Sequence, residues 1–206
     1  MKKLSTLILS LALVAISANL FAQKGYNVGD QAKDFSLKNT AGKMVSFSSY
    51  PKAKGFIVVF TCNHCPFAKA YEQRIINLHK KYSDLGYPVI AINPNDKDRE
   101  PEDSYENMQK RAKEKSYPFP YLYDESQATA KEYGATRTPH VFIVTKTATG
   151  NEVKYIGAID DNYEEPEKVQ TKYAEDALNA LLANKPVTTS STKAIGCGIK
   201  WKKEKM

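Results

Sequence analysis

Two of the three cysteines in this 206-residue chain are separated by only two residues, in Cys62-Asn63-His64-Cys65. An apolar run at residues 55–60 precedes the pair and helical periodicity follows it, so the pair is predicted to lie where a buried strand leads into a helix. Two thiols in the first helical turn can close a disulfide, and the helix N-terminus favours the thiolate of Cys62. Because a thiolate is the nucleophile of disulfide exchange, the pair predicts redox chemistry.

Cys-x-x-Cys also occurs in zinc sites, but structural zinc takes four ligands, and the remaining cysteine, Cys197, is distant in sequence. We therefore predict no metal site and no cofactor. A copper(I) site made by Cys62, Cys65 and either His64 or His140 is a minor alternative, because thiolates suit this soft ion.

Two further features of the sequence add to the chemistry expected of the cysteine pair. A protonated His64 would stabilise the Cys62 thiolate and make the disulfide more oxidising, whereas the alternative is an exposed histidine without a partner. Thr138-Pro139 directly precedes an apolar strand. A cis bond before Pro139 is chemically accessible, because an X–Pro bond loses most of the trans preference, and the alternative is an ordinary trans edge-strand proline.

Cys197 lies between Gly196 and Gly198 in a Thr/Ser- and Lys-rich tail, residues 184–206. Glycines on both sides permit close backbone approach. Such a tail could return to the active site and supply a resolving cysteine. The alternatives are an inert buried thiol and a disordered tail end.

The elements that position these residues follow from hydrophobic periodicity. Extended segments flanking residues 40–42 predict a hairpin, and Asp124, Gly134 and Pro166 are typical of helix ends. The order of elements fits a single α/β domain over residues 26–183, with a mixed central sheet flanked by helices. Strands are expected at 55–60, 88–92, 121–123, 140–145 and 154–158, and helices at 68–82, 102–116, 125–133 and 166–181.

Residues 1–22 are predicted to be a signal peptide. Lys2 and Lys3 precede an apolar stretch at residues 7–16, and Ala22 suits a cleavage site. The stretch is short for a transmembrane anchor. We expect a periplasmic or extracellular protein, cleaved after Ala22, with no stable membrane anchor.

The excess of basic over acidic residues carries little functional information. Loss of Lys2 and Lys3 leaves 28 basic against 23 acidic residues, which lowers the net charge from +7 to +5. The lysines are spread along the chain and cluster only at residues 200–205, without a recognition motif, so no nucleic-acid partner is expected.

The cysteine pair at a strand–helix junction, together with Thr138-Pro139, resembles the thioredoxin superfamily, whose cis proline faces the active-site sulfurs. Residues 29–37, 42–45, 54–60 and 134–144 are similar to its alkyl hydroperoxide reductase/thiol-specific antioxidant (AhpC/TSA), or peroxiredoxin-like, branch. The likeness covers residues 26–183 and implies a thioredoxin-like fold. Lys33 and Ile57 stand where that branch has prolines, while Thr61 and Cys65 match the end of its peroxidatic motif.

This resemblance implies two functions. In a thiol–disulfide oxidoreductase, Cys62 attacks a substrate disulfide, Cys65 resolves the mixed disulfide, and Thr138 and Pro139 position the substrate backbone. The partners would be protein disulfides or dithiols, or a redox partner protein.

In a thiol peroxidase with antioxidant activity, Cys62 or Cys65 would react with a peroxide. Thr61 and Arg137 are the candidates to surround the sulfur, and Cys197 is the candidate resolving cysteine.

Overall fold

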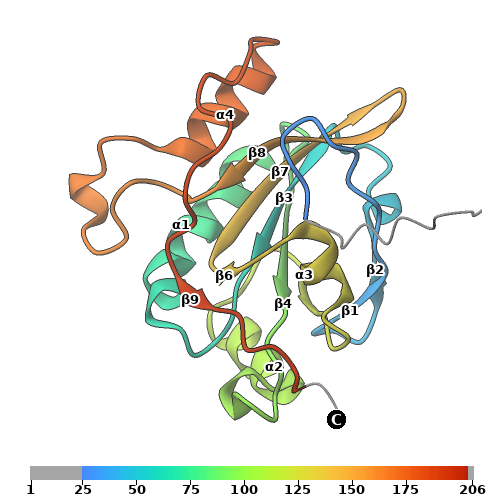
Figure 1. Cartoon of the computed structure of the whole chain (residues 1–206), viewed down its shortest axis with the longest axis vertical. Coiled ribbons are helices and arrows are strands. Elements are labelled where there is room, and N and C mark those ends of the chain that lie inside the picture. Colours follow the sequence, from blue (N-terminus) through green and yellow to red (C-terminus); the bar gives the residue numbers. More distant parts are fainter. Residues whose placement is uncertain (1–24, 204–206) are drawn as a thin grey trace, which may run out of the picture.

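Seven strands form one mixed sheet in the computed structural model, which describes residues 25–203 (Figure 1). The predicted signal peptide lies outside the described residues. The strand order is β2-β1-β5-β4-β3-β7-β8, which confirms the predicted mixed sheet with an N-terminal hairpin. The strands are β1 (Leu37–Asn39), β2 (Met44–Val45), β3 (Gly55–Phe60), β4 (Val89–Asn93), β5 (Tyr121–Tyr123), β7 (His140–Thr147) and β8 (Gly150–Gly157).

Parallel pairing of β3, β4 and β5 brings their carboxyl ends to the same edge of the sheet. The helix α1 (Pro66–Tyr82) connects β3 to β4. The β3 side chains from Phe56 to Phe60 are fully buried, because both faces of the sheet are covered. This edge is where β3 delivers the cysteine pair.

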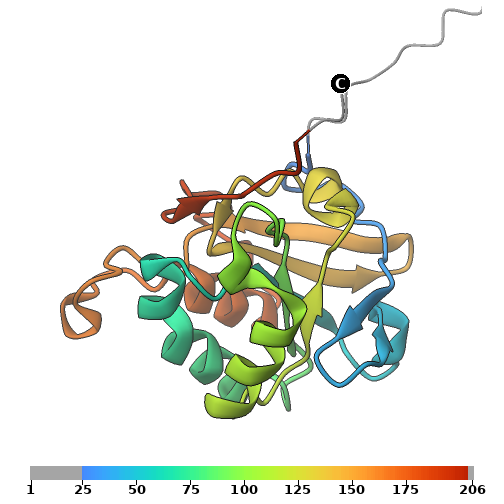
Figure 2. The same ribbon diagram turned by 90° about the horizontal axis from the view of Figure 1, so that it is seen from below.

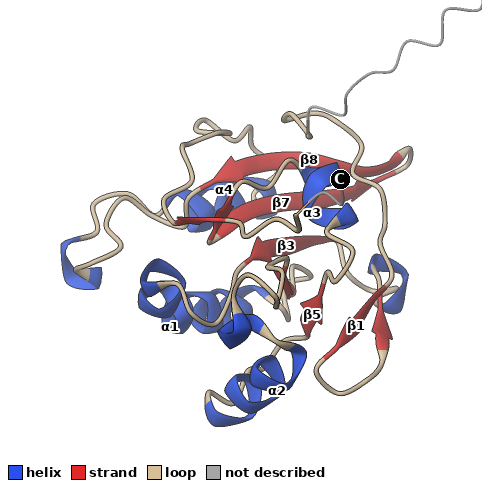
Figure 3. Ribbon diagram, turned by 60° about the horizontal axis from the view of Figure 1, so that its bottom comes forward, coloured by secondary structure: helices blue, strands red, loops and turns tan. Residues whose placement is uncertain are grey.

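Helices cover the two faces of the sheet unequally (Figures 2 and 3). Ile57 and Val59 pack with α1, α2 (Tyr105–Glu114) and α4 (Tyr173–Leu182). The alternate β3 residues Phe56, Val58 and Phe60 pack with α3 (Ala128–Tyr133), the N-terminal segment and Ile199 of the tail. The apolar β3 run therefore divides between two cores, as the period of two in a strand requires. Within residues 25–203 no helix has the length and apolar character needed to cross a bilayer.

The structure corrects two helix starts. Pro166 begins a separate 3₁₀ turn, Pro166–Lys168, and α4 starts only at Tyr173. The Asp161 carboxylate accepts hydrogen bonds from the backbone N–H groups of Gln170 and Thr171, which holds the intervening chain in a non-helical form.

The helix predicted over residues 102–116 is likewise divided. Pro101–Asp103 forms a 3₁₀ turn, and Ser104 caps α2 by accepting a hydrogen bond from the N–H of Asn107. Asp103 is therefore outside the helix.

The C-terminal tail packs against the domain as far as residue 203, where the described residues end, so the disordered alternative is wrong for that part of the tail. Its strand β9 (Cys197–Gly198) pairs antiparallel with β6 (Arg137–Thr138). Ile199 is buried, and Ser191 forms a bridge with Ile156 of β8. In Figure 1 the tail runs in red past the start of α1 to reach β6.

Candidate active site

The structure brings all three cysteines together at the N-terminus of α1. Cys65 is the N-cap residue, and Pro66 is in the first helical turn, where its missing N–H costs little. Cys65 forms a disulfide with Cys197, with 6.0 Å between their Cα atoms. Cys62 is the free thiol and is only 4% exposed. The predicted Cys62–Cys65 pairing is thus not the one in this structure, although the two residues are neighbours as expected.

The pairing of β9 with β6 explains how Cys197 reaches Cys65. The register sets Cys197 opposite Thr138. A Cβ at Gly196 would lie 2.3 Å from the Thr138 carbonyl oxygen, so the close approach requires glycine. The Arg137 guanidinium also donates to the Gly196 carbonyl at 2.9 Å.

A second set of contacts anchors the chain after Cys197. The Lys200 N–H donates to Asn95 Oδ1 at 2.8 Å, and the Lys200 carbonyl accepts from the Asp96 N–H at 2.9 Å. With Ile199 buried as well, the tail is attached on both sides of Cys197 independently of the disulfide. Cys197 is therefore held near the other two sulfurs.

Thr138 contacts both cysteines of the pair. Its Oγ1 lies 3.1 Å from Cys62 Sγ, and its carbonyl oxygen lies 3.3 Å from Cys65 Sγ. The Thr138–Pro139 peptide is cis, as predicted. The segment singled out by sequence thus lies directly against the sulfurs.

The environment of Cys62 keeps it protonated in this state. Burial, and secondarily the Asp103 carboxylate, raises the pKa of Cys62 to about 12. The Thr138 hydroxyl and the backbone N–H groups of His64 and Cys65 act in the opposite direction, as expected at a helix N-terminus. Desolvation outweighs them, so Cys62 is a neutral thiol while the Cys65–Cys197 disulfide is closed.

Asp103 is the residue that sequence reasoning missed. Its carboxylate is fully buried and lies 2.6 Å from His64 Nδ1, so the alternative of an unpartnered His64 is wrong. The sequence placed Asp103 at the start of the helix predicted over residues 102–116, and no local motif linked it to the cysteines. The available signal was topological: Asp103 follows β4, whose carboxyl end shares an edge with the β3 end that carries Cys62.

Among the described residues, the remaining predicted site residues form no hydrogen bond to the Cys62 sulfur. Thr61 is buried, and its backbone N–H donates to the Ile92 carbonyl; between residues 25 and 203 no hydrogen bond joins its hydroxyl to a cysteine. The side chain of Arg137 is committed to Gly196. His140 is buried beside Phe142, and burial, followed by the Arg137 charge, lowers the pKa of His140 to about 4.

Metal-binding atoms do gather here. One atom each from Cys62, His64 and Asp103 lie within 4.8 Å of one another. However, Asp103 Oδ2 already accepts hydrogen bonds from Asn95 Nδ2 at 2.7 Å and pairs with His64 Nδ1. Cys65 cannot supply a thiolate while it is bonded to Cys197, which removes a ligand from the copper(I) alternative.

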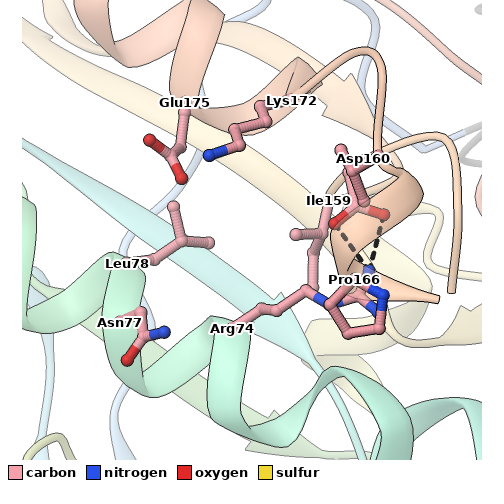
Figure 4. A pocket seen from close by; sticks show the side chains of 9 residues that line it. Arg74, Asn77, Leu78, Ile159, Asp160, Pro166, Lys172 and Glu175 are labelled. Carbon is pink, nitrogen blue, oxygen red and sulfur yellow. Dashed lines mark hydrogen bonds and ion pairs between the residues drawn. The ribbon is translucent and has the colours of Figure 1, made fainter.

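A separate pocket of about 190 Å³ lies between α1 and α4 (Figure 4). Arg74 crosses it and pairs with Asp160 at 2.7 Å. Arg74 is nine residues after Cys65, about 13 Å along α1. Glu175, which also lines the pocket, pairs with Lys81, so the charges of Arg74, Asp160 and Glu175 are engaged in ion pairs.

Comparison with family models agrees with the resemblance found in the sequence. The model of the AhpC/TSA family matches residues 28–156. No curated protein matches the chain in sequence.

Similar solved structures extend over nearly the whole chain. An uncharacterized conserved protein from Geobacillus kaustophilus is 39% identical, with a TM-score of 0.78, over 85% of this chain and 93% of its own. A hypothetical protein, SMc02350, from Sinorhizobium meliloti is 32% identical, with a TM-score of 0.79, over 86% of this chain and 96% of its own.

A third similar structure is named as a redox protein. It is a putative thiol:disulfide interchange protein, DsbE, from Chlorobium tepidum, with 20% identity and a TM-score of 0.58 over 76% of this chain and 98% of its own. At that identity the likeness shows the thioredoxin-like fold alone, which confirms the fold predicted from the sequence.

Proposed function

Because the chain belongs to the AhpC/TSA family of redox proteins, we propose that it is an exported thiol–disulfide oxidoreductase whose three cysteines share one disulfide. The observation that carries this proposal is the free Cys62 thiol beside the Cys65–Cys197 disulfide, with Thr138 against both Cys62 and Cys65. Two of these cysteines are the Cys-x-x-Cys pair, and the third is supplied by the tail. The disulfide in the structure is the oxidised end state of the proposed cycle.

The cycle begins with three thiols. The Cys62 thiolate attacks a substrate disulfide and displaces one substrate thiolate, which gives a mixed disulfide. The Cys65 thiolate then attacks the Cys62 sulfur and displaces the second substrate thiolate, which leaves a Cys62–Cys65 disulfide. In each step the attacking thiol loses a proton and the departing thiolate gains one, so two electrons pass to the substrate.

Exchange within the protein follows. Cys197 attacks the Cys65 sulfur, forms the Cys65–Cys197 disulfide and releases Cys62 as a thiol. The anchoring of Lys200 and Ile199 supports this step, because it keeps Cys197 close at every stage. A dithiol partner then reduces Cys65–Cys197 and restores the three thiols.

Reduction of insulin disulfides tests the assignment. We expect the Cys62→Ser variant to be inactive, while Cys197→Ser retains the first turnover because Cys62 and Cys65 are intact. Undiminished insulin reduction by Cys62→Ser would overturn the proposal, and the matched Cys197→Ser variant shows whether replacing any cysteine of the cluster is itself harmful.

A thiol peroxidase is the second candidate, favoured by the burial of Cys62. A sulfur that is only 4% exposed is more accessible to a small peroxide than to a protein disulfide. Cys62 would be oxidised to a sulfenic acid while the peroxide is reduced to an alcohol or water, and Cys65 would then displace water to form Cys62–Cys65. Stopped-flow mixing of the reduced protein with hydrogen peroxide tests it, since a rate no faster than that of free cysteine eliminates the peroxidase.

A further inference from the structure

We propose that Asp103 is a positioning residue of the redox site, which holds His64 beside Cys62 and, together with His64, sets how readily Cys62 ionises. This inference rests on the proposed function only in taking Cys62 as the nucleophile. Asp103 comes from the 3₁₀ turn after β4, which nothing in the cysteine motif specifies.

The Asp103 carboxylate binds the backbone of the cysteine loop directly. Its Oδ1 accepts hydrogen bonds from the N–H of Asn63 at 2.6 Å and from the N–H of His64 at 3.3 Å. Its Oδ2 lies 2.6 Å from His64 Nδ1 and accepts from Asn95 Nδ2 at 2.7 Å. A fully buried carboxylate is costly unless its lone pairs are satisfied, and here the donors are those of the active-site loop itself.

Further hydrogen bonds join the same two segments. Asn63 Nδ2 donates to the Glu102 carbonyl at 2.8 Å, and the Tyr121 hydroxyl donates to Asn63 Oδ1 at 3.0 Å. The Asp103 carbonyl accepts from Asn93 Nδ2 at 3.1 Å. The loop between the cysteines is therefore fixed to the turn after β4 and to Tyr121, the first residue of β5, so His64 has a defined orientation.

The charges around Cys62 act in opposite directions. The Asp103 carboxylate disfavours a second negative charge on Cys62, whereas a proton on both nitrogens of His64 would favour it. Glu100, 3.5 Å from His64 Nε2, and the hydroxyl of Tyr121 are the other titratable groups facing this cluster. Cys65 and Cys197 do not titrate in the disulfide state, and the exposed Lys69–Glu102 pair lies at the outer rim.

Ionisation of Cys62 can be measured without any substrate. In the disulfide state Cys62 is the free thiol, so thiolate absorbance as a function of pH reports on it once the profile of Cys62→Ser, with the same tyrosines, is subtracted. We expect Asp103→Asn to lower the midpoint of the Cys62 titration by about one pH unit. The carboxylate lies within 4.8 Å of the Cys62 sulfur, and a charge at that distance shifts a thiol titration by this order. Asn95→Ala is the control: it removes a neutral donor to the same oxygen, together with the acceptor of the Lys200 N–H, and should not lower the midpoint.

An unchanged or higher midpoint in Asp103→Asn would overturn the proposal, because a merely structural role would loosen the loop without moving the titration.

His64→Gln provides a second route if Asp103→Asn does not fold. Its alkylation by iodoacetamide should be about tenfold slower than that of the wild type at pH 6, because glutamine cannot carry the positive charge that favours the Cys62 thiolate. An equal rate for the two proteins would refute the role of His64. Neither measurement needs a disulfide substrate, so failure of insulin reduction would be a separate result.

Discussion

Replacing Gly196 by alanine should weaken the Cys65–Cys197 disulfide specifically. The added Cβ would lie 2.3 Å from the carbonyl oxygen of Thr138, 2.6 Å from its carbonyl carbon and 3.0 Å from the nitrogen of Pro139. All three are backbone atoms, so relief requires a shift of about 1 Å by either β6 or the tail, at a cost of about 1–3 kcal/mol. In the reduced variant the tail can relieve the clash by moving away from β6, whereas the Cys65–Cys197 disulfide requires the close approach, so the cost applies to closure of the disulfide.

The free-energy cost of the Gly196→Ala clash converts directly to a change in the reduction potential of the Cys65–Cys197 disulfide. A cost of about 1–3 kcal/mol raises the potential of this two-electron couple by about 20–60 mV. The assay equilibrates each protein with glutathione buffers, quenches exchange with acid, alkylates the free thiols and determines the oxidised fraction by mass.

Gly198→Ala provides the matched control, because a Cβ there meets no atom within 4 Å. Both replacements restrict the unfolded chain equally, so that contribution cancels. Equal potentials for the two variants would refute the inference that close approach of Gly196 to β6 brings Cys197 to Cys65.

Three further outcomes follow from burial and charge. Cys197→Ser removes a cross-link between residues 132 apart in sequence and should lower the unfolding free energy measured in urea by as much as about 5 kcal/mol; a value equal to the wild type would contradict the cross-link. His140 has a pKa lowered from 6.5 to about 4, so its unfolded imidazole binds a proton first and stability falls between pH 6.5 and 4, by about 3 kcal/mol in total. His140→Gln should lose that part of the pH dependence. If the unfolding free energy of the variant, measured in urea, falls between pH 7 and 4.5 by as much as that of the wild type, the role of His140 is refuted. Asp160→Asn leaves the Arg74 charge without its carboxylate and should cost about 3 kcal/mol, again by urea unfolding, with no change expected in insulin reduction.

Local patterns were sufficient to predict the central sheet and the cysteine pair. The buried strand at residues 55–60 is a continuous apolar run, and the helix after Cys65 has an apolar stripe, so both signals lie within one segment. The cis bond before Pro139 was also accessible from sequence through the family resemblance.

The disulfide pairing and Asp103 depend on tertiary geometry instead. Cys197 reaches Cys65 through a two-residue strand whose register is set by Gly196 against Thr138, segments far apart in sequence. Asp103 is in a charged 3₁₀ turn, and it becomes part of the site only because parallel strands end at one edge. The start of α4 was misjudged for a similar reason, since Asp161 holds the residues after Pro166 out of a helix.

Peptide mapping of the fully oxidised protein tests the central claim most directly. Free thiols are alkylated under denaturing acid conditions, and each disulfide-linked peptide pair is identified by mass spectrometry, for wild type and for Cys197→Ser. The three-cysteine cycle predicts Cys65–Cys197 with an alkylated Cys62 in the wild type, and Cys62–Cys65 in the variant. A wild-type protein that holds only Cys62–Cys65, or a variant that forms no Cys62–Cys65 disulfide, would contradict it.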